Sequence, residues 1–183
     1  MMATMKTLLM TLFMTITLTN VQAADKIESV RVFKSERRME LVGADNQVVK
    51  TYKIMLGKNP VGHKVQEGDN KTPEGIYILD SKNPNSKFHK AIHVSYPNKA
   101  DTQKAKSLGV RAGGDIMVHG FPNSFKEMRA WLNGAGLGFL SDDLIRSSLP
   151  YFDWTSGCIA VSDAEIDEIY SLITVPTKII IHP

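Results

Sequence analysis

The sequence predicts a mainly β domain of the α+β class, in which a few helices are inserted late in the chain. Two segments, IESVRVF (27–33) and VVKTYKIML (48–56), alternate apolar with polar residues, which is typical of strands with one buried face. Polar stretches rich in Gly, Pro and Asn separate the predicted strands. Patterns that begin helices are concentrated after residue 120.

The predicted strands begin with a meander. MELVG (39–43) lies between the two segments above, and the turn sequences SERR (35–38) and ADNQ (44–47) join the three, so we expect antiparallel pairing. A loop rich in Gly, Pro and Asn (57–74) leads into the strand GIYIL (75–79). The remaining predicted strands are KAIHVSY (90–96), AGGDIMVHG (112–120) and the buried C-terminal TKIIIHP (177–183).

Capping residues predict three helices. Ser124 is followed three residues later by Glu127, and Ser162 by Glu165, which is the spacing of a capping box. Ser141 begins a further short helix, SDDLIRSSL (141–149), and Pro176 ends the last one. The chain has no repeat or linker, so we expect one domain.

The first residues have the layout of a secretory signal peptide. Lys6 precedes an apolar stretch (8–18), and Ala23 ends a segment suited to cleavage. The stretch is short and rich in Thr for a membrane span, and no cysteine follows the cut for lipid attachment. We therefore expect residues 1–23 to be removed and residues 24–183 to form an exported domain without stable membrane insertion.

Composition excludes several classes of function. The net charge of +3 includes Lys6, so the exported domain is weakly basic, and no dense patch of Lys, Arg and aromatic residues indicates nucleic acid. Asp69, Glu74 and Asp115 do not stand at metal-ligand spacing, and no phosphate loop or dinucleotide fingerprint occurs. The sequence therefore predicts no metal site and no other cofactor.

Cys158 is the only cysteine of the chain. In an exported protein an unpaired cysteine is either a reactive thiol or a small buried apolar residue, and the count alone favours neither. Gly157 leaves room for a carbonyl substrate, and the N–H groups of Gly157 and Cys158 are candidate oxyanion donors. Because the helix predicted at Ser162 begins soon after Cys158, we expect its positive end to lower the pKa of the thiol.

A nucleophilic cysteine needs a base, and His119 is the best candidate. It ends an apolar strand and is followed by Gly120, whereas the other histidines lie in loops, inside a strand or beside the terminus. Those others are His63, His89, His93 and His182.

Two motifs together resemble the L,D-transpeptidase catalytic domain (YkuD type). They are the pair His119-Gly120 with the later run TSGCI (155–159), and the upstream segment GDNKTPEGIYIL (68–79). The resemblance implies an L,D-transpeptidase-like β-sandwich, with the first two predicted helices inserted between the histidine and cysteine motifs. It also implies that Cys158 is the nucleophile, that His119 is the general base and acid, and that the backbone carbonyl of Gly120 orients His119.

The implied substrate is a peptidoglycan stem peptide in the periplasm, within cell wall biogenesis and the control of cell shape. Thr155, Ser156 and Gly157 would supply oxyanion or substrate contacts, with Thr155 also holding the cysteine turn through its hydroxyl. Arg111 either pairs with a substrate carboxylate or is a solvated loop charge.

The chain departs from the family pattern at three points. Most members have histidine where Ser156 stands and many have Arg or Asn where Ala160 stands, and 38 residues separate His119 from Cys158, more than is usual. These features resemble the branch that includes the murein hydrolase which detaches the outer-membrane lipoprotein.

Three functions therefore stay open. The first is an L,D-transpeptidase that works through a thioester. The second is a hydrolase on the same substrate, either an L,D-carboxypeptidase or a diaminopimelate–lipoprotein amidase, with murein-bound lipoprotein as a partner. The third is a non-catalytic murein-binding domain with an inert Cys158.

Overall fold

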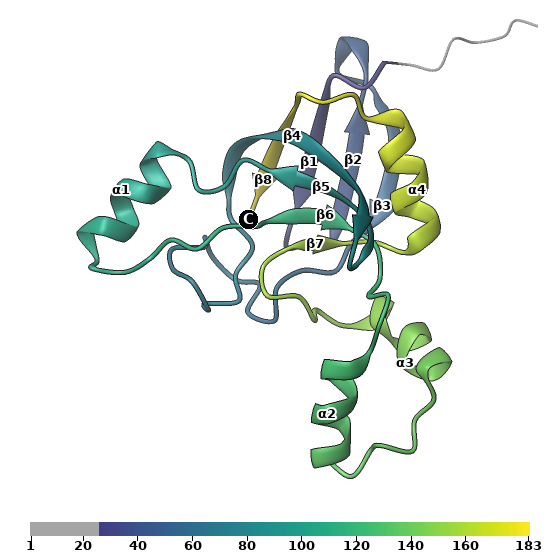
Figure 1. The fold of residues 1–183 in the computed structure, drawn as a ribbon. Helices are drawn as coiled ribbons and strands as arrows, with labels where there is room; N and C mark the ends of the chain where they lie inside the picture. Colours follow the sequence, from purple (N-terminus) through teal and green to yellow (C-terminus); the bar gives the residue numbers. More distant parts are fainter. Residues whose placement is uncertain (1–25) are drawn as a thin grey trace, which may run out of the picture.

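The computed structural model describes residues 26–183, apart from the side chains of Glu127, Met128 and Trp131. The predicted signal peptide (1–23) lies outside the described residues. In the described part, eight strands form one mixed sheet in the order β3-β2-β1-β8-β4-β5-β6-β7 (Figure 1). In chain order the strands are β1 (Ser29–Phe33), β2 (Arg38–Val42), β3 (Val48–Lys53), β4 (Gly75–Ser86), β5 (His89–Val94), β6 (Met117–His119), β7 (Ile159–Ala160) and β8 (Thr177–His182).

The N-terminal meander is confirmed. Strand β1 pairs antiparallel with β2, and β2 pairs antiparallel with β3. The C-terminal strand β8 then runs parallel to β1 and antiparallel to β4. Because β8 lies between these neighbours, it joins the meander to the strands that carry His119 and approach Cys158.

The sheet curls until its two ends meet. Just beyond β3, the N–H of Met55 donates to the carbonyl of Ala160 in β7 (2.9 Å), and the N–H of Ala160 donates back to Met55 (2.8 Å). A further bridge joins Gly57 to Thr155. The curl places two halves of the sheet face to face, as the predicted sandwich requires, and the mainly β fold class is confirmed.

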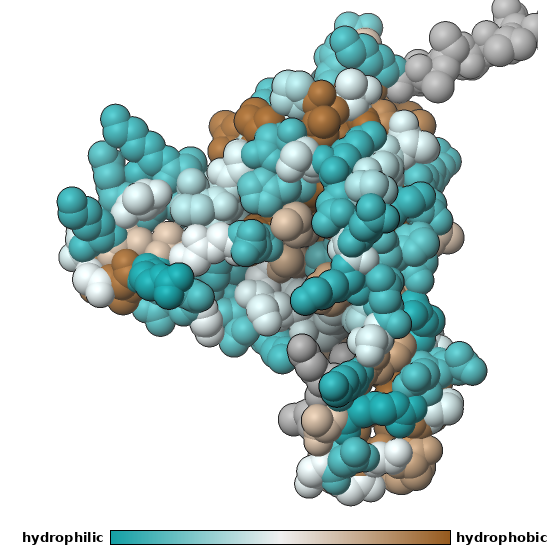
Figure 2. Space-filling view, in the orientation of Figure 1, coloured by the Kyte–Doolittle hydropathy of each residue, from teal (hydrophilic) through white to brown (hydrophobic). Residues whose placement is uncertain are grey.

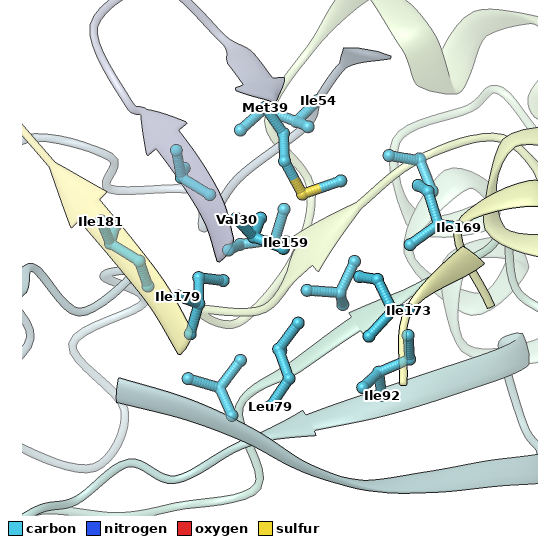
Figure 3. Close-up of a cluster of buried hydrophobic side chains, with 14 of the residues drawn as sticks. Val30, Met39, Ile54, Leu79, Ile92, Ile159, Ile169, Ile173, Ile179 and Ile181 are labelled. Atoms are coloured by element: carbon cyan, nitrogen blue, oxygen red, sulfur yellow. The ribbon is translucent and has the colours of Figure 1, made fainter. Parts of the chain in front are cut away.

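The main core fills the inside of this curl. Figure 3 shows side chains from the meander facing side chains from β4, β5 and β7. Each large apolar side chain buried there contributes about 1.5–3 kcal/mol of hydrophobic stabilisation. The labelled members are Val30, Met39, Ile54, Leu79, Ile92, Ile159, Ile169, Ile173, Ile179 and Ile181.

The three predicted helices are confirmed as α2 (Lys126–Gly134), α3 (Asp142–Ser148) and α4 (Asp163–Leu172). The Ser141 hydroxyl accepts the N–H of Leu144 (3.2 Å). At α4, the Ser162 hydroxyl accepts the N–H of Glu165 (3.4 Å), and the Glu165 carboxylate accepts the N–H of Ser162 (2.8 Å), which completes the capping box.

A fourth helix, α1 (Lys99–Ser107), was not expected. Its N-cap Asn98 accepts the N–H groups of Ala100 and Asp101, and the Asp101 carboxylate accepts the N–H of Asn98 (2.9 Å). The helix is mostly polar and buries little besides Ala105 and Asp101, so no apolar stripe marks it in the sequence. None of the helices within residues 26–183 has the length and apolar character needed to cross a membrane.

Candidate active site

His119 and Cys158 come from two neighbouring parallel strands. Across β6 and β7, Val118 pairs with Ile159 and His119 with Ala160. Cys158 directly precedes β7 and stands two residues before Ala160, and side chains two residues apart on extended backbone point to the same face. His119 and Cys158 are therefore diagonal neighbours on one face of the sheet, while Val118 and Ile159 point into the main core on the other.

The imidazole of His119 is buried, with only 2% of the residue exposed. Its Nδ1 lies 2.7 Å from the carbonyl oxygen of Gly120. A carbonyl only accepts hydrogen bonds, so Nδ1 carries the proton, and the neutral ring keeps its lone pair on Nε2. Phe88 lies against the ring (centroids 4.4 Å apart), and Trp154 meets it edge-on (5.7 Å).

Burial lowers the pKa of His119 to about 4, because the charged imidazolium is poorly solvated there, and the Gly120 carbonyl opposes this effect only in part. His119 is therefore a neutral imidazole at neutral pH. A neutral ring with a free Nε2 lone pair is the form that can accept a proton from a thiol.

Cys158 is half-buried, and its Sγ lies 3.4 Å from the backbone carbonyl oxygen of Asp115. Burial raises the pKa of the Cys158 thiol, and the Asp115 carboxylate adds to this effect. The Met117 N–H and the Lys64 ammonium act in the opposite direction.

The net shift is therefore upward, opposite to the lowered pKa that was expected for Cys158 from its place before α4. The polar partners of the sulfur come from the segment entering β6, and desolvation outweighs them. Burial thus favours the thiol form of Cys158 over the thiolate.

Thr155 shapes the turn that presents Cys158. Its hydroxyl donates to the carbonyl of Cys158 (2.8 Å) and accepts the N–H of Gly157 (3.1 Å). The N–H of Gly157, one of the two candidate oxyanion donors, thus has the Thr155 hydroxyl as its partner. The N–H of Cys158 is the other candidate oxyanion donor.

Gly157 is required by its conformation and its surroundings. Its φ is +134°, in the region that side chains rarely adopt, and a Cβ there would lie 2.7 Å from the carbonyl oxygen of Lys71. The motif at residues 68–79 therefore packs directly against the cysteine turn.

Asp69 ties that motif together. Its carboxylate accepts the N–H groups of Val65, Gln66 and Lys71 and pairs with the Lys64 ammonium (2.9 Å). These charge-assisted bonds hold the pKa of Asp69 below its ordinary value although burial opposes them. Sequence reasoning used this motif only as a family signature, whereas the structure shows that it supports the cysteine turn.

The start of the cysteine turn is anchored by Asp153. The Arg37 guanidinium binds its carboxylate through Nε (3.1 and 3.0 Å) and one terminal nitrogen (2.7 Å), and the N–H of Leu56 donates to the same group (2.8 Å). Both ends of the turn are therefore held by the sheet and its loops.

The segment between the two motifs forms a wall on the His119 face. An insertion cluster, composed mainly of apolar residues from 121 to 149, packs on Met55, Trp154 and Ala160. Figure 1 shows α2 and α3 extending away from the sheet on this side. The members from the inserted segment are Phe121, Phe125, Leu132, Ile145 and Leu149, with Leu140 packed against them.

Asp163 at the start of α4 ties this wall to the sheet. Its carboxylate accepts the N–H of Phe121 (2.8 Å) and pairs with Arg146 (2.7 Å), which also donates to the Pro122 carbonyl (2.9 Å). A Cβ on Gly120 would lie 2.7 Å from Asp163 Oδ1, so this close approach needs glycine.

The remaining predicted site residues lie around the turn. Ser156 is exposed beside Cys158, and the Arg111 side chain is 86% exposed and lies 3.2 Å from Glu67 through its Nε. Each of the other histidines has a partner of its own: His63 with Asp101, His89 with Asp167, His93 with Asp80, and His182 stacked on Phe33.

Comparison with known proteins identifies the family. The family model of the L,D-transpeptidase catalytic domain, YkuD, matches residues 28–181. The chain belongs to the L,D-transpeptidase catalytic domain family. YafK of Escherichia coli (strain K12) is 33% identical over 96 residues, which cover 50% of this chain and 37% of YafK.

Two solved structures have a fold similar to that of this chain. The helical cell shape determining protein Pgp2 from Campylobacter jejuni (TM-score 0.56) and Bd1075 from Bdellovibrio bacteriovorus (TM-score 0.53) are each 24% identical, and each match covers 86% of this chain and 48% of that chain. This L,D-transpeptidase domain therefore spans less than half of the length of YafK, Pgp2 and Bd1075.

One residue that departs from the L,D-transpeptidase pattern lies in the insertion cluster. Ala160, where many members have Arg or Asn, is fully buried in the insertion cluster. At this position the small apolar side chain is part of the packing between the sheet and the inserted segment.

Proposed function

We propose that the protein is an exported cysteine enzyme that acts on peptidoglycan stem peptides through a thioester, as an L,D-transpeptidase. The pairing of β6 with β7 carries the proposal, because it supports a His119–Cys158 pair inside a domain whose family acts on peptidoglycan. The predicted signal peptide (1–23) would deliver residues 24–183 across the inner membrane to the periplasm.

In the first step the proton of Cys158 moves from Sγ to Nε2 of His119 as the sulfur attacks the acyl carbon. A C–S bond forms, the C–N bond to the D-amino acid breaks, and the imidazolium returns the proton to the leaving nitrogen, which departs as an amine. A histidine whose pKa is about 4 is, once protonated, a stronger acid than an ordinary imidazolium, which favours the return of the proton to the leaving nitrogen. The Gly120 carbonyl holds the ring in the required orientation throughout.

The tetrahedral intermediate needs a donor for its oxygen. The N–H of Gly157 donates to the Thr155 hydroxyl, so we assign the oxyanion donor role to the N–H of Cys158. The exposed hydroxyl of the neighbouring Ser156 is a second candidate donor. We assign to Thr155 a role through the shape of the turn, and to Arg111 the binding of a carboxylate of the stem peptide.

The acceptor decides the outcome. An amine gives transpeptidation, whereas water gives an L,D-carboxypeptidase or an amidase that releases murein-bound lipoprotein. The buried Ala160 favours this hydrolytic alternative, because no polar side chain at that position is left to hold an acceptor amine. The raised pKa of Cys158 favours the other alternative, a non-catalytic murein-binding domain with an inert thiol.

Incubation with purified muropeptides separates these functions. The products of the wild type are compared by mass spectrometry with those of Cys158→Ala and His119→Ala. Cross-linked or exchanged stems that vanish in both variants support the transpeptidase, and shortened stems or released lipoprotein remnants support the hydrolase. Unchanged muropeptides with a folded wild type contradict both enzymatic functions.

A further inference from the structure

A hollow of about 600 Å³ opens between α1 and the loop that returns to β6. The loop is held firmly: the Arg111 carbonyl accepts the N–H of Glu67 (2.8 Å), and the Ala112 carbonyl accepts the hydroxyl of Tyr96 (3.1 Å). Gly113 packs so closely on Glu67 that a Cβ would lie 3.2 Å from its Cα. The hollow is therefore a built feature, and its volume is in the range of small-molecule sites.

Asp115 connects this hollow to the proposed nucleophile. It lines the hollow, and its backbone carbonyl oxygen lies 3.4 Å from Sγ of Cys158. Its exposed carboxylate makes no hydrogen bond or ion pair with any group in the described part of the chain, residues 26–183. The same carboxylate opposes ionisation of the thiol, so it is unfavourable to the nucleophile unless a cation binds there.

Two cations line the same hollow. Lys106 comes from α1 and Arg111 from the returning loop, and the contact of Arg111 with Glu67 uses Nε, which leaves its terminal nitrogens for another group. The surface of α1 and this loop is largely hydrophilic in Figure 2. A site lined by the unpaired carboxylate of Asp115 and by two cations, one of which also contacts Glu67, is complementary to a ligand that carries both charges.

The proposed reaction produces such a ligand. When the bond to a terminal D-amino acid is cleaved, the nitrogen becomes an ammonium one carbon away from a carboxylate. A free D-amino acid carries the same two charges, as does the D-centre of a second stem before its ammonium loses the proton that it must give up to attack as acceptor.

We propose that the hollow between α1 and residues 108–115 binds the α-ammonium carboxylate group of the departing or attacking D-amino acid, with Asp115 facing the ammonium and Lys106 and Arg111 facing the carboxylate. This assignment rests on the proposed function. It makes Asp115 a specificity-determining residue on the amine side of the reaction, separate from His119, which moves the proton.

The test is a D-alanine titration followed by NMR, in purified protein that carries Cys158→Ala so that no chemistry occurs. We expect saturable shifts at amides of residues 106–115, and a dissociation constant raised by roughly 10-fold or more when Asp115→Asn is added, as for loss of a charge-assisted bond. Ethylamine and propionate, which each carry one of the two charges, should bind more weakly than D-alanine.

Asp45→Asn is the matched control, since Asp45 is also an exposed aspartate with positive φ (54°, against 53° for Asp115). It should leave D-alanine binding unchanged. In protein that retains Cys158, Asp115→Asn should raise the rate of alkylation by iodoacetamide at fixed pH, and Asp45→Asn should not.

Failure of the two proposals is distinguishable. Equal dissociation constants in the Asp115→Asn and control proteins, or no binding of D-alanine at all, would overturn the site. Absence of any Cys158-dependent product from muropeptides would overturn the proposed function. It would not change the D-alanine titration, because that experiment uses protein that carries Cys158→Ala.

Discussion

Thr155 offers a direct test of how the cysteine turn is held. Only 4% of the residue is exposed, and its hydroxyl serves two backbone groups of the turn, the N–H of Gly157 and the carbonyl of Cys158. Thr155→Val keeps the shape and removes the hydroxyl. The buried N–H of Gly157 then lacks a partner, which costs about 1–3 kcal/mol, and loss of the bond to Cys158 adds about 0.5–1.5 kcal/mol.

We therefore expect Thr155→Val to lower the free energy of unfolding by about 1.5–4.5 kcal/mol, measured by urea denaturation followed by circular dichroism. Thr155→Ser is the matched control, because it keeps the hydroxyl and loses one methyl group, worth roughly 1 kcal/mol. A valine variant within about 0.5 kcal/mol of the wild type, or a serine variant as unstable as the valine variant, would refute this account of the turn.

Two further predictions concern His119 and a close backbone contact. The unfolded chain protonates His119 below its ordinary pKa of 6.5, whereas the folded protein keeps it neutral down to a pKa of about 4. Stability should therefore fall as the pH falls through this window, by about 3 kcal/mol in total from this residue. Urea unfolding at several pH values should show that His119→Gln lacks this part of the slope, and equal slopes would contradict the burial of a neutral ring. Gly57→Ala should lower the unfolding free energy by about 1–3 kcal/mol or more, because its Cβ would overlap the carbonyl oxygen of Asn70. Gly134→Ala, at the end of α2 with open space around it, should leave stability unchanged or raise it, and equal losses in the two variants would show that the contact is unimportant.

The parts of the fold set by local rules were predictable from the sequence. Period-two alternation marked the meander, because one face of each strand packs on the core. Ser141 and Ser162 marked the starts of α3 and α4, because their hydroxyls satisfy backbone N–H groups at the helix ends. Helix α1 was missed because its cap is an asparagine and not one of the serines that marked the predicted helices, and because it has no apolar stripe. Asn98 and Asp101, at capping-box spacing, were the available signal.

The electrostatics of the site were not predictable, because they depend on contacts distant in sequence. Burial and Asp115, 43 positions away, raise the pKa of Cys158, and neither can be read from the residues around the cysteine. Likewise, the sequence does not show that the N–H of Gly157 has a hydrogen-bond partner, because its bond to the Thr155 hydroxyl forms only in the folded turn. The role of Asp69 was hidden for the same reason, since its bonds matter through the contact of Lys71 with Gly157.

The central claim is that Cys158 forms a thioester with a stem peptide. The most direct measurement is the intact mass of the protein after brief incubation with a stem peptide that ends in D-alanine, followed by acid quenching. We predict a mass increase equal to the acyl part of the peptide, located on Cys158 by fragmentation and absent in Cys158→Ala. A folded wild-type protein that gains no such mass while it turns the peptide over, or an equal gain in Cys158→Ala, would contradict the account.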